Sequence, residues 1–149
     1  MATKMKHESS HDEMVKMLKL FEVMRGLQKR HFQAIQQSSG VGGAQIWALE
    51  EINRTPGITL GQLARRLALH RSTTTNLVNR LEKMRLVNKH RSTRDQRNVS
   101  VEPTPRGVQV LAASPKPSGG LLKHALIDLP PAALRSLKRD LHTVISSMR

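Results

Sequence analysis

Two short amphipathic segments, separated by only three residues, limit the fold of this chain more than any other feature. Thr59 and Gln62 form a capping box at the start of the first segment, in which each side chain satisfies a free backbone N–H of the other residue. The inward-facing residues recur at helical spacing, namely Leu60, Leu63, Ala64 and Leu67, then Thr74, Leu77, Val78 and Leu81. Because residues 68–70 leave room only for a short turn, the pattern predicts a helix-turn-helix of residues 59–67 and 71–84.

The flanking sequence predicts further helices and a hairpin. A Met-rich stripe over 13–36 indicates a long helix, and Gly40 begins the glycine-rich stretch that ends it. Thr104 and Pro105 mark another helix start, because Thr is a good N-cap and Pro is favoured at the first helical position. The Ser114–Gly120 stretch, with two prolines and two glycines, must bend or break the helical path. The remaining expected elements are helices over 44–53, 105–113, 121–127 and from about 130 onward, and strands over 87–91 and 98–102 with a charged tip at 92–97.

These elements make a mostly α-helical protein with a small β-hairpin wing: a winged helix-turn-helix of about six helices. Residues 1–12 are polar and are expected to be disordered, and residues 13–149 should form a single domain. The last helix carries a heptad seam suited to another helix, formed by Leu134, Leu137, Leu141, Val144 and Met148. Because a subunit of this size can hardly bury this seam and the long first helix alone, we expect a homodimer.

The charge of the chain narrows the class of partner. Its 149 residues contain 25 Lys and Arg against 11 Asp and Glu, a net charge of +14 that favours a polyanionic partner. Between residues 54 and 106 there are 12 basic and 3 acidic residues, a net +9 concentrated on the helix-turn-helix and the hairpin. Aromatic residues for base stacking are scarce, so we expect double-stranded rather than single-stranded nucleic acid.

Several other classes of protein are not supported. The chain has no cysteine, which removes disulfides, thiolate zinc sites and thiol redox sensing. Without a Gly-rich phosphate loop or a recognisable hydrolase or metalloprotease motif, we do not expect an enzyme. No secretory signal or long apolar run is present, so a cytoplasmic protein is expected. His7, His11 and Asp12 could form a metal cluster, since the two histidines at i and i+4 share a helix face, but no strong third ligand is evident, and we expect no metal or cofactor.

The outward face of the helix over 71–84 carries the residue types that read DNA. Arg can bond guanine, Asn can bond adenine, and Ser or Thr can contact phosphates or a thymine methyl group. Glu82 is the one acid on this face, whereas helical faces of non-binding proteins usually mix both signs. The expected DNA-contacting residues are Arg71, Ser72, Thr73, Thr75, Asn76, Asn79 and Arg80 on the helix, with Lys89, Arg91, Arg94, Asp95 and Arg97 in the wing.

From about Ile46 to Leu111 the chain resembles the MarR family of bacterial regulators. The resemblance is carried by Leu63–Leu67, Arg71–Lys83, Leu86-Val87, the wing Arg91–Arg97, and Thr104-Pro105-Arg106-Gly107, which is close to the family's Thr-x-x-Gly. It implies a triangular homodimer whose two winged lobes, here about residues 44–103, straddle a pseudo-palindromic operator. The dimerisation lobe would be about residues 13–38 plus 104–149, and the helix over 71–84 would read the major groove.

The resemblance also implies roles in the wing and a ligand cleft. Arg97 would reach the minor groove, and Asp95 would steady it. Many members bind small organic anions, often phenolic, between the two lobes, and this binding weakens their hold on DNA. Candidate effector residues on the elements lining that cleft are Met24, Arg25, His31 and Trp47. An Arg or His facing an apolar wall suits an organic carboxylate, although core and surface roles are equally compatible with these residues.

Four positions depart from the family's pattern. Arg85 stands where a glycine usually ends the recognition helix, so either a left-handed cap costs about 1 kcal/mol more than with Gly, or the turn is built differently. His70 replaces the usual Asp or Ser cap and could instead touch a phosphate. Pro103 replaces an apolar residue at the end of the second wing strand. The Ser114–Gly120 break interrupts what is normally one long helix, which affects the dimer geometry and the ligand cleft.

The expected function is sequence-specific regulation of transcription, most simply repression that a small ligand relieves. One alternative is a non-specific architectural DNA-binding protein, which would use the same charge with little sequence preference. Another is a membrane-surface protein, but no basic amphipathic helix with bulky aromatic residues supports it.

A wing prediction follows from the sequence. Arg97→Ala should weaken DNA binding by about 1–3 kcal/mol and lower the salt slope by about one unit per subunit, because a minor-groove guanidinium is lost. Asp95→Ala should also weaken binding, although it removes a negative charge, because the arginine is no longer oriented. Titrations at several salt concentrations measure both effects, and tighter binding by Asp95→Ala on all sequences would contradict the orienting role.

Overall fold

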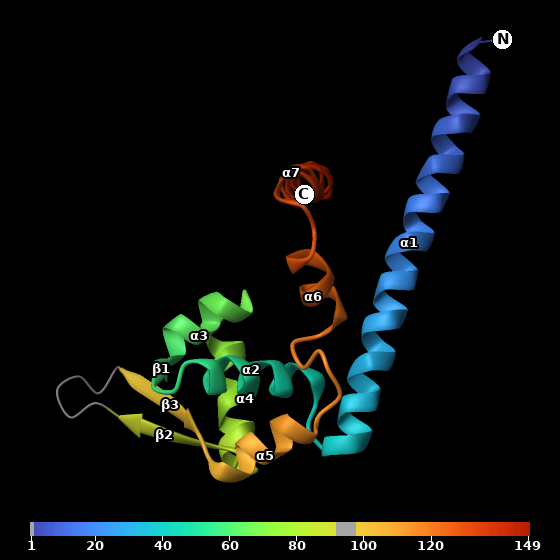
Figure 1. The fold of residues 1–149 in the computed structure, drawn as a ribbon. Helices are drawn as coiled ribbons and strands as arrows, with labels where there is room; N and C mark the ends of the chain where they lie inside the picture. Colours follow the sequence, from blue (N-terminus) through green and yellow to red (C-terminus); the bar gives the residue numbers. More distant parts are fainter. Residues whose placement is uncertain (1, 92–97) are drawn as a thin grey trace.

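The computed structural model describes residues 2–91 and 98–149, and Figure 1 shows its long first helix standing away from a smaller globular part. In that part of the chain there are seven helices and three strands. The predicted wing residues Arg94, Asp95 and Arg97 lie outside the described residues. The elements are α1 (Ala2–Ser39), α2 (Gly43–Arg54), β1 (Ile58–Thr59), α3 (Leu60–Leu67), α4 (Arg71–Lys83), β2 (Val87–Arg91), β3 (Val99–Pro103), α5 (Pro105–Ala113), α6 (Leu121–Ile127) and α7 (Pro131–Ser147).

The winged helix-turn-helix expected from the sequence is present. Thr59 accepts a hydrogen bond from the backbone N–H of Gln62 at 3.2 Å, and Gln62 accepts one from the N–H of Thr59 at 3.0 Å, so the capping box forms. Ala68 ends α3 in a left-handed conformation, and His70 begins α4 without a side-chain cap. The expected poor cap at His70 is therefore confirmed.

The core of this part is organised around α2, which contacts α1, α3, α4, α5 and β3. Ile46, Leu49 and Ile52 on α2 are fully buried. They belong to one apolar cluster with Leu63 and Leu67 of α3, Val78 and Leu81 of α4, and Val101 of β3. Because buried side chains pack closely, this cluster fixes α4 relative to the other helices.

The wing is part of a three-stranded antiparallel sheet in the order β1-β3-β2. Val101 in the central strand pairs with Ile58 on one side and Lys89 on the other. The sequence predicted the two longer strands and missed β1, because two residues give no alternating pattern to detect. Pro103 is the last residue of β3 and lies beyond the residues that pair with β1, so one side of the strand is an edge there and proline is tolerated.

A compact junction joins the end of α4 to the start of α5. Arg85 has a φ of 60°, so the left-handed cap expected as one alternative at this position is the one observed. The hydroxyl of Thr104 donates to the carbonyl of Arg85 at 2.8 Å and accepts from the N–H of Gly107 at 3.0 Å. Gly107 lies directly against the carbonyl of Leu86. The Thr-x-x-Gly residues therefore pack the start of α5 against the turn after α4.

The Ser114–Gly120 stretch separates α5 from α6, as expected. Gly120 has a φ of 93°, a conformation that strongly favours glycine. The stretch is tied to α1 by a hydrogen bond of 2.8 Å between a ring nitrogen of His31 and the carbonyl of Pro117. Nearby, the N–H of Leu122 donates to the side chain of Gln28 at 3.1 Å. The break therefore turns the chain along α1 instead of continuing one helix.

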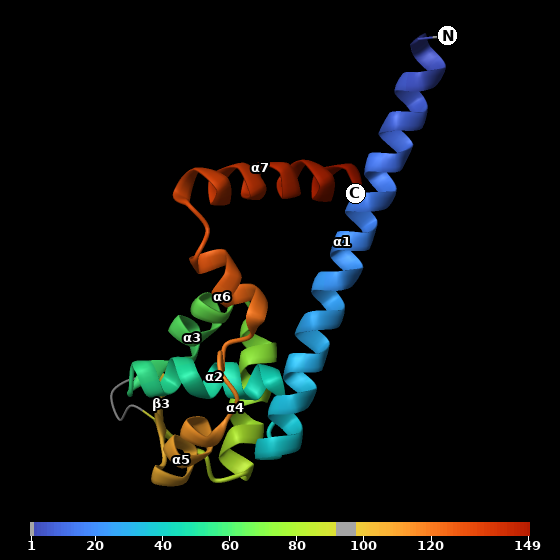
Figure 2. The same ribbon diagram turned by 45° about the vertical axis from the view of Figure 1, so that its right-hand side comes forward.

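Helix α1 differs from the sequence expectation at its start. It begins at Ala2, so the segment 1–12 that was expected to be disordered is helical from residue 2 onward. Residues 2–12 lack a proline or glycine to stop the helix, and polarity alone does not end it. In Figure 2 the α1 rod extends well past the other elements. None of the described helices is apolar enough over a sufficient length to cross a membrane.

The α4–α5 junction gives a stability prediction. Gly107→Ala places a methyl group against the Leu86 carbonyl, so we expect a loss of about 1–3 kcal/mol in unfolding free energy, measured by urea denaturation. Gly61→Ala is the matched control, because nothing lies within 4 Å of an added Cβ there and alanine favours helix. Equal stability of the two variants would contradict the close approach at Gly107.

Candidate DNA interface

Helix α4 presents a polar, basic face to solvent. Thr74, Val78 and Leu81 are buried on its inner side. The predicted contact residues Arg71, Ser72, Thr73, Asn76 and Arg80 are all exposed on the other side, and Thr75 and Asn79 are half-buried. Seven of the twelve predicted DNA contacts therefore share one helix, with five of them open to an approaching duplex.

The wing contributes Lys89 and Arg91 from β2 beside this face. A cleft of about 550 Å³ between α4 and the wing strands is lined by Leu60, Thr75, Asn79, Glu82, Lys89, Arg91 and Val99. Arg91 is exposed at the end of β2. The residues of α4 and β2 that were predicted to contact bases and phosphates therefore lie next to one another.

Lys89 is already engaged within the protein. Its Nζ lies 2.7 Å from Oε2 of Glu82 and donates to Oδ1 of Asn79 at 2.8 Å. Sequence reasoning named Lys89 and Asn79 as separate DNA contacts and missed the pair that joins them. Glu82 could have indicated this pair from the sequence, because a single acid on a basic face needs a cationic partner.

A second polar cluster ties the winged lobe to α6. The Glu51 side chain is only 6% exposed, and its Oε1 lies 2.6 Å from Nζ of Lys123. Arg54 lies 3.4 Å from the same oxygen, and Arg66 of α3 lies 3.8 Å from Oε2. Lys123 also stands 5.6 Å from the centre of the Trp47 ring, a cation–π contact. One buried carboxylate therefore joins α2, α3 and α6.

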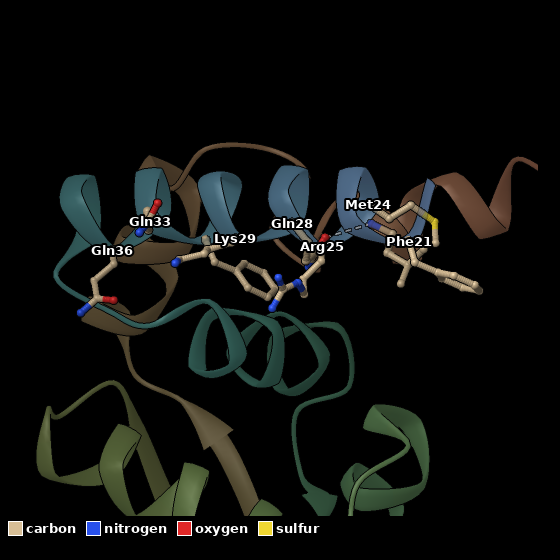
Figure 3. Close-up of a pocket in the computed structure, with 9 residues that line it drawn as sticks. Phe21, Met24, Arg25, Gln28, Lys29, Gln33 and Gln36 are labelled. Atoms are coloured by element: carbon tan, nitrogen blue, oxygen red, sulfur yellow. Dashed lines mark hydrogen bonds between the residues drawn. The ribbon is translucent and has the colours of Figure 1, made fainter. Parts of the chain in front are cut away.

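The candidate effector residues fall into three places. Met24 and Arg25 line a cavity of about 720 Å³ along α1, together with Phe21, Gln28, Lys29, Phe32, Gln33, Gln36 and Leu122. Figure 3 shows these side chains along one side of α1. The Arg25 guanidinium is paired with Glu22 at 2.7 Å, so Lys29 adds a cation that sequence reasoning missed.

Trp47 lines a different cavity, of about 480 Å³, with Lys123 and Leu126. Gln28 and Leu122 line both cavities, so the two are neighbours. His31 lines neither of these and instead bonds the Pro117 carbonyl. The structure thus brings three of the four candidates to adjoining cavities and gives His31 a structural bond.

A comparison with family models matches part of the chain. The MarR family model covers residues 39–98, the span from the end of α1 to just before β3.

Residues 39–98 of this chain are therefore of the MarR type.

Solved structures show the same fold over most of the chain. The Staphylococcus aureus MepR–DNA complex has 18% identity and a TM-score of 0.63, covering 89% of this chain and 96% of that one. BldR from Sulfolobus solfataricus has 24% identity and a TM-score of 0.59, covering 91% and 96%. PcaV from Streptomyces coelicolor, solved with its natural ligand, has 21% identity and a TM-score of 0.58, covering 85% and 92%. A search of curated protein sequences gives no match.

The exposed face of α4 generates a prediction for DNA binding. Arg71→Ala and Asn76→Ala should each relax base preference and cost about 1–3 kcal/mol in DNA binding, because each removes a side chain able to bond a base edge. Competition between related duplexes at one salt concentration measures both effects. Arg139→Ala removes the same charge from α7 and serves as the control, because it should leave base preference intact. Unchanged preference in both α4 variants would show that α4 does not read bases.

Proposed function

We propose that this chain is a cytoplasmic, homodimeric repressor that binds a pseudo-palindromic operator and leaves it when a small organic ligand binds. The observation that carries the proposal is the combination of two faces in one chain. The exposed face of α4 is polar and basic, and α1 and α7 expose apolar side chains that need a partner. A reading helix joined to an unburied dimerisation surface is the arrangement that a two-fold operator requires.

The apolar surface argues for a second copy of the chain. On α1 and α7, many large apolar side chains are between about two-fifths and four-fifths exposed, namely Met14, Met17, Leu18, Leu20, Phe21, Val23, Met24, Leu27, Leu134, Leu137, Val144, Ile145 and Met148. A groove of about 420 Å³ on α6 and α7 is lined by Leu126, Leu134, Leu137, Lys138, Leu141, His142 and Ile145. Soluble monomers rarely expose so much contiguous apolar surface. The heptad spacing of α7 suits a helix as the occupant.

Double-stranded DNA is the partner that the winged lobe fits. Its net charge between residues 54 and 106 lies on the same elements as the exposed α4 face. A MepR structure has been solved with DNA on this fold. The face also holds Arg71 and Asn76, whose side chains can distinguish bases, which favours sequence-specific binding over architectural binding.

The paired cavities are the place where an effector would act. Trp47 Nε1 is buried without a hydrogen-bond partner in the described part of the chain, and Lys123 lies over the same ring. A phenolate or carboxylate oxygen could accept from both groups, while the apolar walls cover its ring. Lys123 also pairs with Glu51, so such an anion would compete for the cation that joins α6 to the winged lobe. PcaV shows that this fold can be solved with a natural ligand bound.

The assembly is tested by light scattering. A dimer should give a mass near twice 16.7 kDa at micromolar concentration. Leu137→Glu places a charge on the α7 seam and should shift the mass toward the monomer, whereas Arg135→Glu, off the seam, should not. A folded wild-type monomer at this concentration would contradict the proposed dimer.

Selection from a random duplex pool tests the function itself. A dimer should enrich a pseudo-palindrome of about 16–20 base pairs with half-sites about one helical turn apart. Affinity for that site should exceed affinity for random duplex by about a thousandfold or more at the same salt concentration. Equal affinity for both would favour the architectural alternative. Release of the selected duplex by phenolic or aromatic carboxylates, scored by fluorescence anisotropy, tests the effector.

A further inference from the structure

Asn79 on α4 is held differently from Asn76, although they lie three residues apart on one face. Nζ of Lys89 donates to Oδ1 of Asn79 at 2.8 Å, and Glu82 holds the same ammonium at 2.7 Å. In the described part of the chain, the side chain of Asn76 makes no hydrogen bond. The amide of Asn79 is therefore oriented by the wing, whereas that of Asn76 is free to turn toward a base.

The chemistry of lysine fixes which atoms Asn79 offers to DNA. An ammonium group only donates, so the Asn79 atom that faces it must be the oxygen. Asparagine reads adenine by accepting from N6 with Oδ1 while Nδ2 donates to N7. Oδ1 keeps a second lone pair, but its bond to the charged ammonium of Lys89 makes it a weaker acceptor for the neutral N6 amine of adenine. The two N–H donors of Nδ2 are not engaged by Lys89, and they suit a base edge that presents only hydrogen-bond acceptors.

We infer that Lys89 makes Asn79 a hydrogen-bond donor toward DNA, so that Asn79 selects guanine or thymine in each half-site and disfavours adenine. Guanine offers two adjacent acceptors, N7 and O6, and thymine offers O4, whereas adenine places its one acceptor, N7, beside the donating N6 amine. Asn76 keeps both halves of its amide and remains able to read adenine. The inference rests on the proposed sequence-specific binding and assigns different bases to the two asparagines.

The ion pair with Glu82 makes Lys89 a poor phosphate contact, and the separate bond to Asn79 gives it its role in base selection. The Lys89 side chain is 26% exposed and its charge is paired within the protein, so it has little free charge to offer a phosphate. Lys89 lies on β2, and Glu82 and Asn79 lie on α4. A residue of a wing strand therefore orients the amide of Asn79. Lys89 is accordingly a positioning residue that acts through Asn79.

Selection from a random duplex pool distinguishes this role from a plain charge effect. The wild type should enrich guanine or thymine at one position of each half-site, and Asn79→Ala should lose that preference. Asn79→Asp keeps an acceptor for Lys89 but has no donor, so it should lose the preference too. Lys89→Met frees Oδ1 and should raise adenine at that position by about fivefold or more relative to the wild type.

Two controls isolate the hydrogen bond. Glu82→Gln removes the ion pair but leaves Lys89 on Asn79, so base preference should stay as in the wild type. Asn79→Ala combined with Lys89→Met should match Asn79→Ala alone, because the lysine acts through the asparagine. Enrichment of adenine by the wild type at the Asn79-dependent position, or an unchanged preference in Lys89→Met, overturns the inference while sequence-specific binding stands. Absence of any enriched sequence overturns both.

Discussion

The buried carboxylate of Glu51 is the interaction on which the arrangement of the lobes depends. A carboxylate with a 6% exposed side chain is costly to leave without a cation, and its closest partner, Lys123, comes from α6. Arg54 and Arg66 approach the same group from α2 and α3. Removing Lys123 would leave a buried anion poorly compensated, so the position of α6 against the winged lobe depends on this ion pair.

The α4–α5 junction supplies the other fixed point of the winged lobe. Thr104 bridges the carbonyl of Arg85 and the N–H of Gly107, so it closes the turn after α4 and begins α5 with one hydroxyl. Gly107 allows the backbone of α5 to reach the Leu86 carbonyl. The left-handed conformation of Arg85 costs about 1 kcal/mol relative to glycine, and the bonds at this junction offset it. The direction of α4 is thus set at both ends, by the short turn from α3 and by this junction.

The parts of the fold that the sequence predicts well are those with strong local signals. Helices 105–113 and 121–127 agree with the structure at both ends, because Thr104-Pro105 and the Pro/Gly-rich stretch between them leave little choice. The capping box at Thr59 is local in the same way, whereas at Arg85 the sequence left a left-handed cap and a differently built turn both open. The two-residue strand β1 and the helical start of α1 were missed, because neither has a periodic or capping signal.

The features that escaped sequence analysis are tertiary. Glu51 and Lys123 are separated by 72 residues, and nothing in the pattern around either residue names the other. The pair between Lys89 and Glu82 is closer in sequence but depends on how the sheet places β2 against α4. The outcome for the effector candidates has the same cause. Met24, Arg25 and Trp47 line adjoining cavities. His31 was named only because its helix was expected to line the ligand cleft, and its ring bonds the Pro117 carbonyl instead.

The positions of these clusters limit how a ligand could act on DNA binding. The cavities lie on the α1 and α6 side of α2, and the proposed reading face lies on α4, with a close-packed core between them. A close-packed core transmits strain instead of deforming locally, so the proposed effector would have to act by moving α2, α3 and α4 together. It can do so only if it binds one arrangement of the lobes more tightly than the other. By linkage, bound DNA then lowers the affinity for the ligand by the same factor by which the ligand lowers the affinity for DNA. The bond between Lys123 and Glu51 is the contact between α6 and α2 whose strength an anion in the Trp47 cavity would change directly.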